Sequence, residues 1–272
     1  MLHRLLILLL FFWPCYALAA VERIISLAPH ATELVFAAGL GDKLIAVSDY
    51  SDYPESAQSL PRVANYQGIN IERILTLQPD LVVVWPQGNA IREVDKLARL
   101  GIPLFYSDPK TLDDIALDIE KLSQYASDPK LGMQAANQFR QQLAQLGQKY
   151  AHLDNVHYFY QLSEKPIITL AQGSWPSEIF TFCGGVNIFQ HSPSPYPQAS
   201  IEQVLLAKPE VIFTSEQAIA QGTMWQRWKN QIPAVKKEQI TSINADWLNR
   251  QTPRSLLAIE QVCNYFSQIQ KY

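Results

Sequence analysis

The sequence predicts an α/β fold in which two similar lobes are joined by one long α-helix. Residues 71–85 (IERILTLQPDLVVVW) recur 130 positions later as residues 201–215 (IEQVLLAKPEVIFTS), and such distant self-similarity indicates two copies of one structural unit. Short apolar strands alternate with helical segments, which is typical of a parallel sheet. Residues 129–150 instead carry apolar side chains every three or four positions with no strand beside them. They predict a connecting rod of ~33 Å.

The amino terminus has the pattern of a cleavable export signal. Arg4 precedes the apolar run from Leu5 to Trp13, and Ala17-Leu18-Ala19 is a small-residue cleavage pattern. The run is too short to span a bilayer, so we expect cleavage after Ala19 or Ala20 and export of the mature chain, to the periplasm if the protein belongs to the family it resembles below. The net charge of -3 gives no electrostatic basis for nucleic-acid binding. The predicted units are a signal peptide (1–20), an N-terminal lobe (21–127), a connecting helix (128–151) and a C-terminal lobe (152–272).

Strands and helices alternate through the first lobe. Gly39 is placed to end the first helix, and His30 lies in the loop before that helix. Asn70 is placed to cap the repeat helix, and Gln78-Pro79-Asp80 breaks it before a buried β-branched strand. The predicted strands are 23–28, 44–47, 81–85 and 103–106, and the predicted helices are 33–38, 71–77, 91–100 and 111–125.

The second lobe repeats this plan. Gly184 ends a helix as Gly39 does, and Ser200 with Gln203 has the spacing of a capping box. Thr252 is placed to cap the last helix, with Pro253 at its first position. The predicted strands are 158–162, 167–170, 211–214 and 239–243, and a helix is predicted over 178–183.

Two cysteines, Cys183 and Cys263, follow the export signal. In an exported protein an even pair indicates a disulfide, and the alternative is two buried free thiols. A bond closing this loop would stabilise the fold by ~4 to 5 kcal/mol on the chain-entropy model.

The loops after the strands are aromatic. In open α/β sheets ligands bind beyond the carboxyl ends of the strands. Aromatic faces there predict a wide cleft for a large, flat, partly apolar ligand, with Asp246 and Arg250 bonding polar groups at its edge. The alternative is that each aromatic side chain packs within its own lobe. The candidates are Tyr50, Tyr66, Trp85, Tyr196 and the segment Asp246-Trp247-Leu248-Asn249-Arg250.

Three further residues have alternative interpretations. His30, at a strand end, either contacts the ligand, coordinates a metal centre in it, or is only a polar loop residue. Glu72 and Glu202 each lie in the first turn of a repeat helix, where the helix dipole favours a carboxylate. As a mirrored pair they are also suited to dock a two-fold symmetric basic partner.

Catalytic motifs are absent from the sequence. It has no GxSxG, no HExxH, no phosphate loop and no GxGxxG after a strand. His152, His157 and His191 have no metal-ligand spacing. We therefore expect no enzyme, no catalytic residue and no metal site. The rival interpretation, a periplasmic hydrolase, would require turnover rather than stoichiometric binding.

The order of these segments resembles the periplasmic substrate-binding proteins with a helical hinge. The resemblance covers essentially the whole chain after the signal, through RIISLAPHATELVFAAGL, YQGINIERILTLQPDLVVVW, FCGGVNIF and IEQVLLAKPEVI. SDYSDYP and NADWLNR most resemble the members that bind vitamin B12. The resemblance implies a carrier that captures cobalamin as transported ligand, has no cofactor, and is monomeric when free. Its partners would be the permease and ATPase complex of an ABC importer at the inner membrane.

The resemblance also implies roles for single residues. Tyr50, Trp85 and the segment Asp246 to Arg250 match ligand-binding positions. Tyr66 and Tyr196 stand where better-known members carry tryptophan, and His30 stands where at least one member has a small residue. Glu72 and Glu202 match glutamates that pair with permease arginines, and Cys183 and Cys263 match the family disulfide.

Relatives of the same fold carry other ligands. Haem would require an iron ligand, for which Tyr50 and His30 are the candidates. An anionic ferric siderophore would require several cationic side chains in the cleft, where Arg250 is the only clear candidate.

Overall fold

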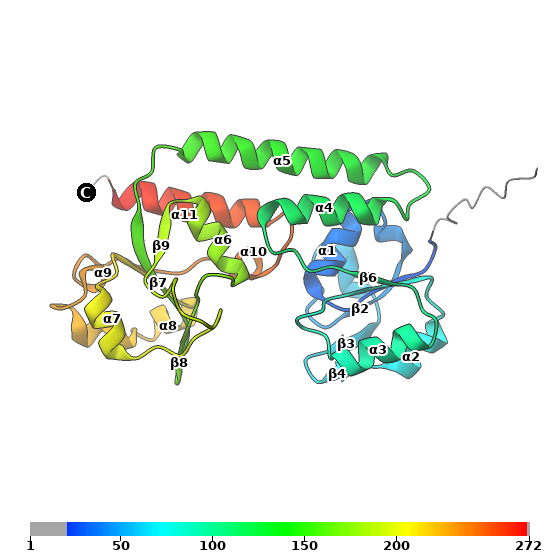
Figure 1. The fold of residues 1–272 in the computed structure, drawn as a ribbon, viewed down its shortest axis with the longest axis horizontal. Helices are drawn as coiled ribbons and strands as arrows, with labels where there is room; N and C mark the ends of the chain where they lie inside the picture. The colour runs from blue at the N-terminus through cyan, green and yellow to red at the C-terminus, as the bar shows by residue number, and fades with distance from the viewer. Residues whose placement is uncertain (1–20, 271–272) are drawn as a thin grey trace, which may run out of the picture.

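The computed structural model describes residues 21–270, which form two α/β lobes lying side by side (Figure 1). The predicted fold class is confirmed. The predicted signal, residues 1–20, lies outside the described residues. Within residues 21–270, no helix is both long and apolar enough to cross a membrane.

The N-terminal lobe contains a six-stranded sheet of order β4-β3-β2-β1-β5-β6. Its central strands are parallel, and β3 and β4 form an antiparallel pair at one edge. The strands are β1 (Ile24–Ser26), β2 (Leu44–Ser48), β3 (Arg62–Asn65), β4 (Gly68–Ile69), β5 (Leu81–Val84) and β6 (Leu104–Tyr106). The α-helices are α1 (Pro29–Ala37), α2 (Ile71–Leu77), α3 (Ile91–Arg99) and α4 (Leu112–Ser123).

The C-terminal lobe contains a five-stranded sheet of order β11-β10-β7-β8, with β9 also paired to β7. The strands are β7 (Val156–Glu164), β8 (Ile167–Thr169), β9 (Gly185–Asn187), β10 (Val211–Phe213) and β11 (Ile240–Thr241). The α-helices are α6 (Trp175–Phe182), α7 (Ile201–Ala207), α8 (Glu216–Ala220), α9 (Pro233–Lys236), α10 (Ala245–Asn249) and α11 (Ser255–Ile269).

The sequence repeat forms the same structural unit in both lobes. Each copy is a capped helix, α2 or α7, that ends at a left-handed residue, Gln78 or Lys208, before the next strand. In each copy the turn has the same length, and the acidic residue after it accepts a backbone N–H from the start of the strand that pairs with the next one. Asp80 accepts from Arg23 at 3.0 Å, and Glu210 accepts from His157 at 2.9 Å. The repeat therefore encodes a helix, a turn and a carboxylate that ties the turn to the sheet.

Three predicted helix starts are wrong, and in two of them a proline lies in the first turn of the observed helix. The first helix begins at Pro29 rather than at residue 33, so His30 lies in its first turn and not in a loop. Likewise α6 begins at Trp175, just before Pro176. Proline suits a first helical turn because its missing N–H has no partner there. In the last helix, Thr252 does not act as the cap: α11 begins at Ser255, and the Thr252 hydroxyl accepts the backbone N–H of Arg254.

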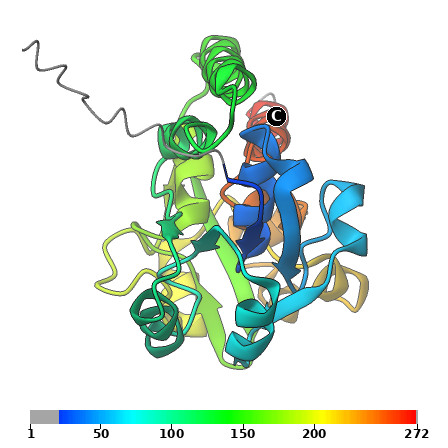
Figure 2. The ribbon, with the colours of Figure 1, turned by 90° about the vertical axis from the view of Figure 1, so that its right-hand side faces the viewer.

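The predicted connector is α5 (Lys130–Tyr150), which lies over α4 of one lobe and α11 of the other (Figures 1 and 2). On the α4 side, the Arg140 Nε lies 2.7 Å from the Asp113 carboxylate. On the α11 side, the Tyr150 hydroxyl bonds Asn264 at 2.6 Å and Lys149 pairs with Glu260 at 2.9 Å. These bonds fix α5 to both lobes, which restricts their relative movement.

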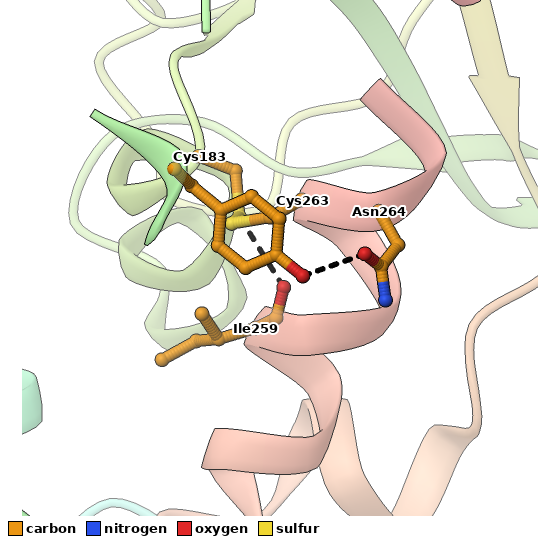
Figure 3. Close-up of a disulfide and its surroundings, with 5 residues drawn as sticks. Cys183, Ile259, Cys263 and Asn264 are labelled. Carbon is orange, nitrogen blue, oxygen red and sulfur yellow. Dashed lines mark hydrogen bonds between the residues drawn. A yellow bond between two sulfur atoms is a disulfide. The ribbon is translucent and has the colours of Figure 1, made fainter. Parts of the chain in front are cut away.

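The predicted disulfide between Cys183 and Cys263 is present, with an S–S distance of 2.00 Å (Figure 3). Cys183 ends α6, and Cys263 lies on α11, where both residues are buried. The bond therefore fastens α11 to the core of the C-terminal lobe.

Candidate functional site

Two adjoining pockets lie at the carboxyl ends of the strands, on the cleft between the lobes. The first, of about 160 Å³, is lined from both lobes, by Trp85, Gln87 and Lys110 on one side and by Leu162, Trp175 and Tyr196 on the other. The second, of about 450 Å³, lies in the C-terminal lobe and includes Asp246. Both pockets share Leu162 and Asn249, so they form one continuous site.

Trp85 follows the fully buried strand β5 and is held by the turn after it. Its backbone N–H donates to the Asn89 side chain at 2.7 Å, and that amide donates to the Leu27 carbonyl at 2.8 Å. A Cβ at Gly88 would come within 1.9 Å of the indole ring, so only glycine fits beneath it. Trp85 is predicted from the sequence, whereas Gly88 and Asn89 are not. Their signal is the turn sequence PQGN between a strand and a helix.

Tyr50 is an exposed aromatic residue in a strained backbone conformation. Its side chain is 73% exposed and its φ is 62°, a region that non-glycine residues rarely adopt. The buried Ser51 hydroxyl holds the loop, bonding Thr32 at 2.9 Å and Ser48 at 3.0 Å. Because such strain persists only where the surroundings enforce it, the loop is built to present the Tyr50 ring outward.

The segment from Asp246 to Arg250 forms α10 and its C-terminal residue, with Asn244 as the N-cap. Leu248 is fully buried, and its carbonyl accepts the Trp175 indole N–H at 3.0 Å. Trp247 is half-buried against the core, while Asn249 and Asp246 line the pockets. Leu248 therefore anchors the segment, Asp246 and Asn249 face the site, and Trp247 and Arg250 line neither pocket.

Arg250 belongs to an ionic group that joins the lobes, here named the Arg250 cluster: Glu33, Asp52, Asp246, Arg250 and Arg254. From the C-terminal lobe, Arg250 Nη1 lies 2.6 Å from Asp52 Oδ1 and 3.4 Å from Glu33 Oε1. Arg254 Nε donates to Glu33 Oε2 at 2.8 Å. Glu33, Asp52 and Arg254 are not predicted as site residues from the sequence. A glutamate within the apolar helix PHATELVFA is nevertheless a sign that its carboxylate is buried and paired with a cation.

Tyr66 and Tyr196 mirror each other in sequence but differ in placement. Tyr196 is 49% exposed and lines the first pocket. Tyr66 is 88% exposed in the turn between β3 and β4, outside the described lining of the two pockets. The structure thus brings Tyr196 to Trp85 and leaves Tyr66 at the lobe surface.

His30 lies beneath Trp85 rather than in the open cleft. Its ring meets the indole edge-on, with centroids 5.3 Å apart, and its side chain is 3% exposed. Within residues 21–270, its Nε2 is buried without a hydrogen-bond partner. Burial lowers the pKa of His30 from 6.5 to about 4. The imidazole is therefore neutral and supports the tryptophan.

The buried His30 predicts a loss of stability in acid. Between pH 6.5 and about pH 4 the unfolded chain binds a proton at His30 that the folded protein does not. The unfolding free energy should fall by about 2 kcal/mol from pH 7 to pH 5 through this residue alone. Urea denaturation of wild type and His30→Gln across this range measures the difference. A difference that is constant with pH would contradict the prediction.

Glu72 and Glu202 are exposed in the first turns of α2 and α7, one on each lobe. Both helices lie on the side of the molecule away from α5 (Figure 1). Asn70 caps α2 by accepting the Arg73 N–H at 2.9 Å, and Ser200 with Gln203 forms the predicted capping box on α7. Hydrogen bonds from its own backbone N–H and from Ser200 lower the pKa of Glu202. Each repeat helix thus presents one carboxylate to solvent in its first turn.

The fold and the cleft define a bilobal binding protein, and the chain belongs to the periplasmic binding protein family, which it matches over residues 24–247. A vitamin B12-binding protein of Vibrio cholerae serotype O1 is 62% identical over 250 residues, covering 92% of this chain and 91% of the relative. The crystal structure of periplasmic vitamin B12 binding protein BtuF of Vibrio cholerae has a TM-score of 0.89 and 61% identity, covering 93% of this chain and 99% of that one.

A more distant structure shares the fold alone. The periplasmic heme-binding protein RhuT from Roseiflexus sp. RS-1 has a TM-score of 0.80 at 22% identity, covering 91% of this chain and 98% of that one. The family membership confirms the predicted class: the chain is a substrate-binding protein and not an enzyme. Within the described residues, no group of three or more His, Cys, Asp or Glu side chains is placed to hold a metal ion.

Proposed function

We propose that this protein binds vitamin B12 in the cleft between its lobes and delivers it to the permease and ATPase complex of an ABC importer. The observation that carries the proposal is the first pocket, where Trp85 of one lobe and Tyr196 of the other line the same space. The identity of 62% to a vitamin B12-binding protein supports this ligand. The protein would act in the periplasm as a monomer, after cleavage of residues 1–20 at Ala19 or Ala20.

The proposed division of work follows the lobes, residues 21–127 and 152–272, joined by the helix of residues 128–151. Aromatic faces from both lobes contact the flat corrin ring, and polar side chains of α10 bond its edge. His30 packs against Trp85, and Leu248 anchors α10 in the core, so both residues support the site without contacting the ligand. Of the proposed contact residues, Trp85, Tyr196, Asp246 and Asn249 line the two pockets. Tyr50, Tyr66, Trp247 and Arg250 line neither pocket and are proposed from their positions in the sequence.

Titration of the purified mature protein with cyanocobalamin tests the proposal. Tryptophan fluorescence and calorimetry should both show saturable one-to-one binding. Hemin in the same assay should not displace cyanocobalamin at equal concentration. No saturable binding at micromolar protein, or stronger binding of hemin, would reject the proposed ligand.

The two exposed glutamates predict a docking defect that is separate from ligand binding. Replacing Glu72 and Glu202 together by lysine should weaken association with the permease complex at least about tenfold, because both lobe contacts would become repulsive. Cyanocobalamin affinity should stay within about twofold, since neither residue lines the pockets. Association is measured with the purified permease complex in detergent or nanodiscs.

A matched control reverses two other exposed carboxylates, Asp95 on α3 and Glu238 after α9. This control has the same net charge change and should dock normally. Loss of cyanocobalamin binding in the Glu72 and Glu202 variant would instead assign both residues a structural role.

A further inference from the structure

Both arginines of the Arg250 cluster are paired with carboxylates of the protein itself. Arg250 Nη1 lies 2.6 Å from Asp52 Oδ1, and Arg250 Nη2 lies 2.8 Å from Asp246 Oδ1. Arg254 is bound to Glu33, whose side chain is only 2% exposed. Three carboxylates and two guanidiniums leave the cluster with one net negative charge. Arg250 is therefore already neutralised before any ligand arrives.

The exposed part of the cluster is acidic. The Arg250 side chain is 13% exposed, whereas the side chains of Asp52 and Asp246 are each 48% exposed. The hydrogen bond from Arg250 lowers the pKa of Asp52, so this carboxylate stays ionised at neutral pH. The exposed polar atoms of the cluster are therefore mainly carboxylate oxygens, which accept hydrogen bonds, rather than guanidinium N–H groups, which donate them, and Asp246 is the member that lines the second pocket.

The residues that line the two pockets add little positive charge. Across the described residues that line the two pockets, Lys110 is the one cation, and its Nζ lies 2.7 Å from Asp108 Oδ1. The same lining includes two carboxylates, Asp246 and Glu216. The cleft is consequently suited to hydrogen-bond donors on a ligand and unsuited to anions.

We propose that the Arg250 cluster is a specificity device that admits ligands with neutral amide edges and rejects ligands with carboxylate edges. The inference rests on the proposed function, because the corrin ring of vitamin B12 carries primary amides at its edge. Amide N–H groups can donate to Asp52 and Asp246. A ligand carboxylate would be placed beside the same oxygens without a free cation, which disfavours it by like-charge repulsion.

A series of three ligands separates charge from size. Cyanocobalamin, its monocarboxylic acid and the methyl ester of that acid differ at one edge group, and only the acid is charged. Wild type should bind the acid at least about tenfold more weakly than the ester at pH 7. The Asp52→Asn variant removes one carboxylate and frees one side of Arg250, so this ratio should shrink at least about threefold.

Two further variants complete the test. Asp246→Asn removes the other exposed carboxylate of the Arg250 cluster and should shrink the ratio in the same direction. Glu55→Gln removes one charge from the same loop region as Asp52, at the exposed start of the turn Glu55–Ser59, and should leave the ratio unchanged. Thermal denaturation confirms that each variant is folded.

The outcomes distinguish this inference from the proposed function. Equal affinity of wild type for acid and ester, or an unchanged ratio in both Asp52→Asn and Asp246→Asn, would overturn the specificity role while cyanocobalamin still binds. A failure of cyanocobalamin itself to bind wild type would overturn the proposed function and this inference with it.

Discussion

Replacing Arg254 by methionine should lower the unfolding free energy by about 3 to 5 kcal/mol. Arg254 bonds Glu33 at 2.8 Å, and the Glu33 side chain is 2% exposed. Without Arg254, this buried carboxylate would keep only Arg250, whose Nη1 lies 3.4 Å away. A buried charge that loses its main partner is costly because neither water nor a nearby cation replaces the lost interaction. Urea denaturation measures the change.

The double variant Glu33→Gln with Arg254→Met is the decisive control. Removing both charges should recover much of the lost stability, which gives a coupling energy in a double-mutant cycle. Lys149→Met serves as the surface comparison, because the Lys149 and Glu260 side chains are 52% and 47% exposed and such pairs contribute little. Additive effects of the Glu33 and Arg254 changes would show that the pair does not hold the lobes together.

Replacing Trp85 by alanine should weaken cyanocobalamin binding by about 100-fold, or about 2.7 kcal/mol. Trp85 supplies the aromatic face of the N-terminal lobe in the first pocket and faces Tyr196 of the other lobe. Its truncation removes stacking area and opens the pocket to water. Trp85→Phe keeps an aromatic face and should lose much less affinity. Calorimetric titration with cyanocobalamin compares the three proteins.

Gly88→Ala tests the same contact without changing the tryptophan. A Cβ at this position would overlap the indole, 1.9 Å from a ring carbon, so the ring must move. Affinity should fall at least about tenfold although Trp85 is intact. Trp228→Phe, in the separate core cluster of the C-terminal lobe, should bind normally. Wild-type affinity in Trp85→Ala would place the ligand elsewhere.

The parts of the fold that the sequence predicts well are those set by local chemistry. The repeat helices, their caps at Asn70 and Ser200, and the left-handed glycines Gly39 and Gly184 depend on a few adjacent residues, and all are present. Elements of two to five residues, such as β4, α8 and α9, were missed because they are too short to show a period. The helices that begin at Pro29 and beside Pro176 start earlier than the sequence predicts, because each proline lies in the first helical turn, ahead of the apolar period.

The residues of the candidate site likewise fall into those that the sequence predicts and those that only the structure shows. Trp85 and Tyr50 were found because aromatic residues after strands are visible in the sequence. The pairing of Glu33 with Arg254 joins positions 221 residues apart, which no local pattern reveals. The burial of His30 depends on the indole above it and on the helix that starts at Pro29, so its neutral state emerges only from the packed structure.

The attachment of α5 to both α4 and α11 has a consequence for communication with a membrane partner. Because Arg140, at the middle of α5, holds the helix to the first lobe and Tyr150, at its C-terminal end, holds it to the second, the separation of Glu72 and Glu202 is largely set before any ligand binds. A partner that contacted only those two carboxylates would meet the same spacing on empty and loaded molecules. Occupancy would have to be sensed from the residues around the ligand, and not from the spacing of the two carboxylates.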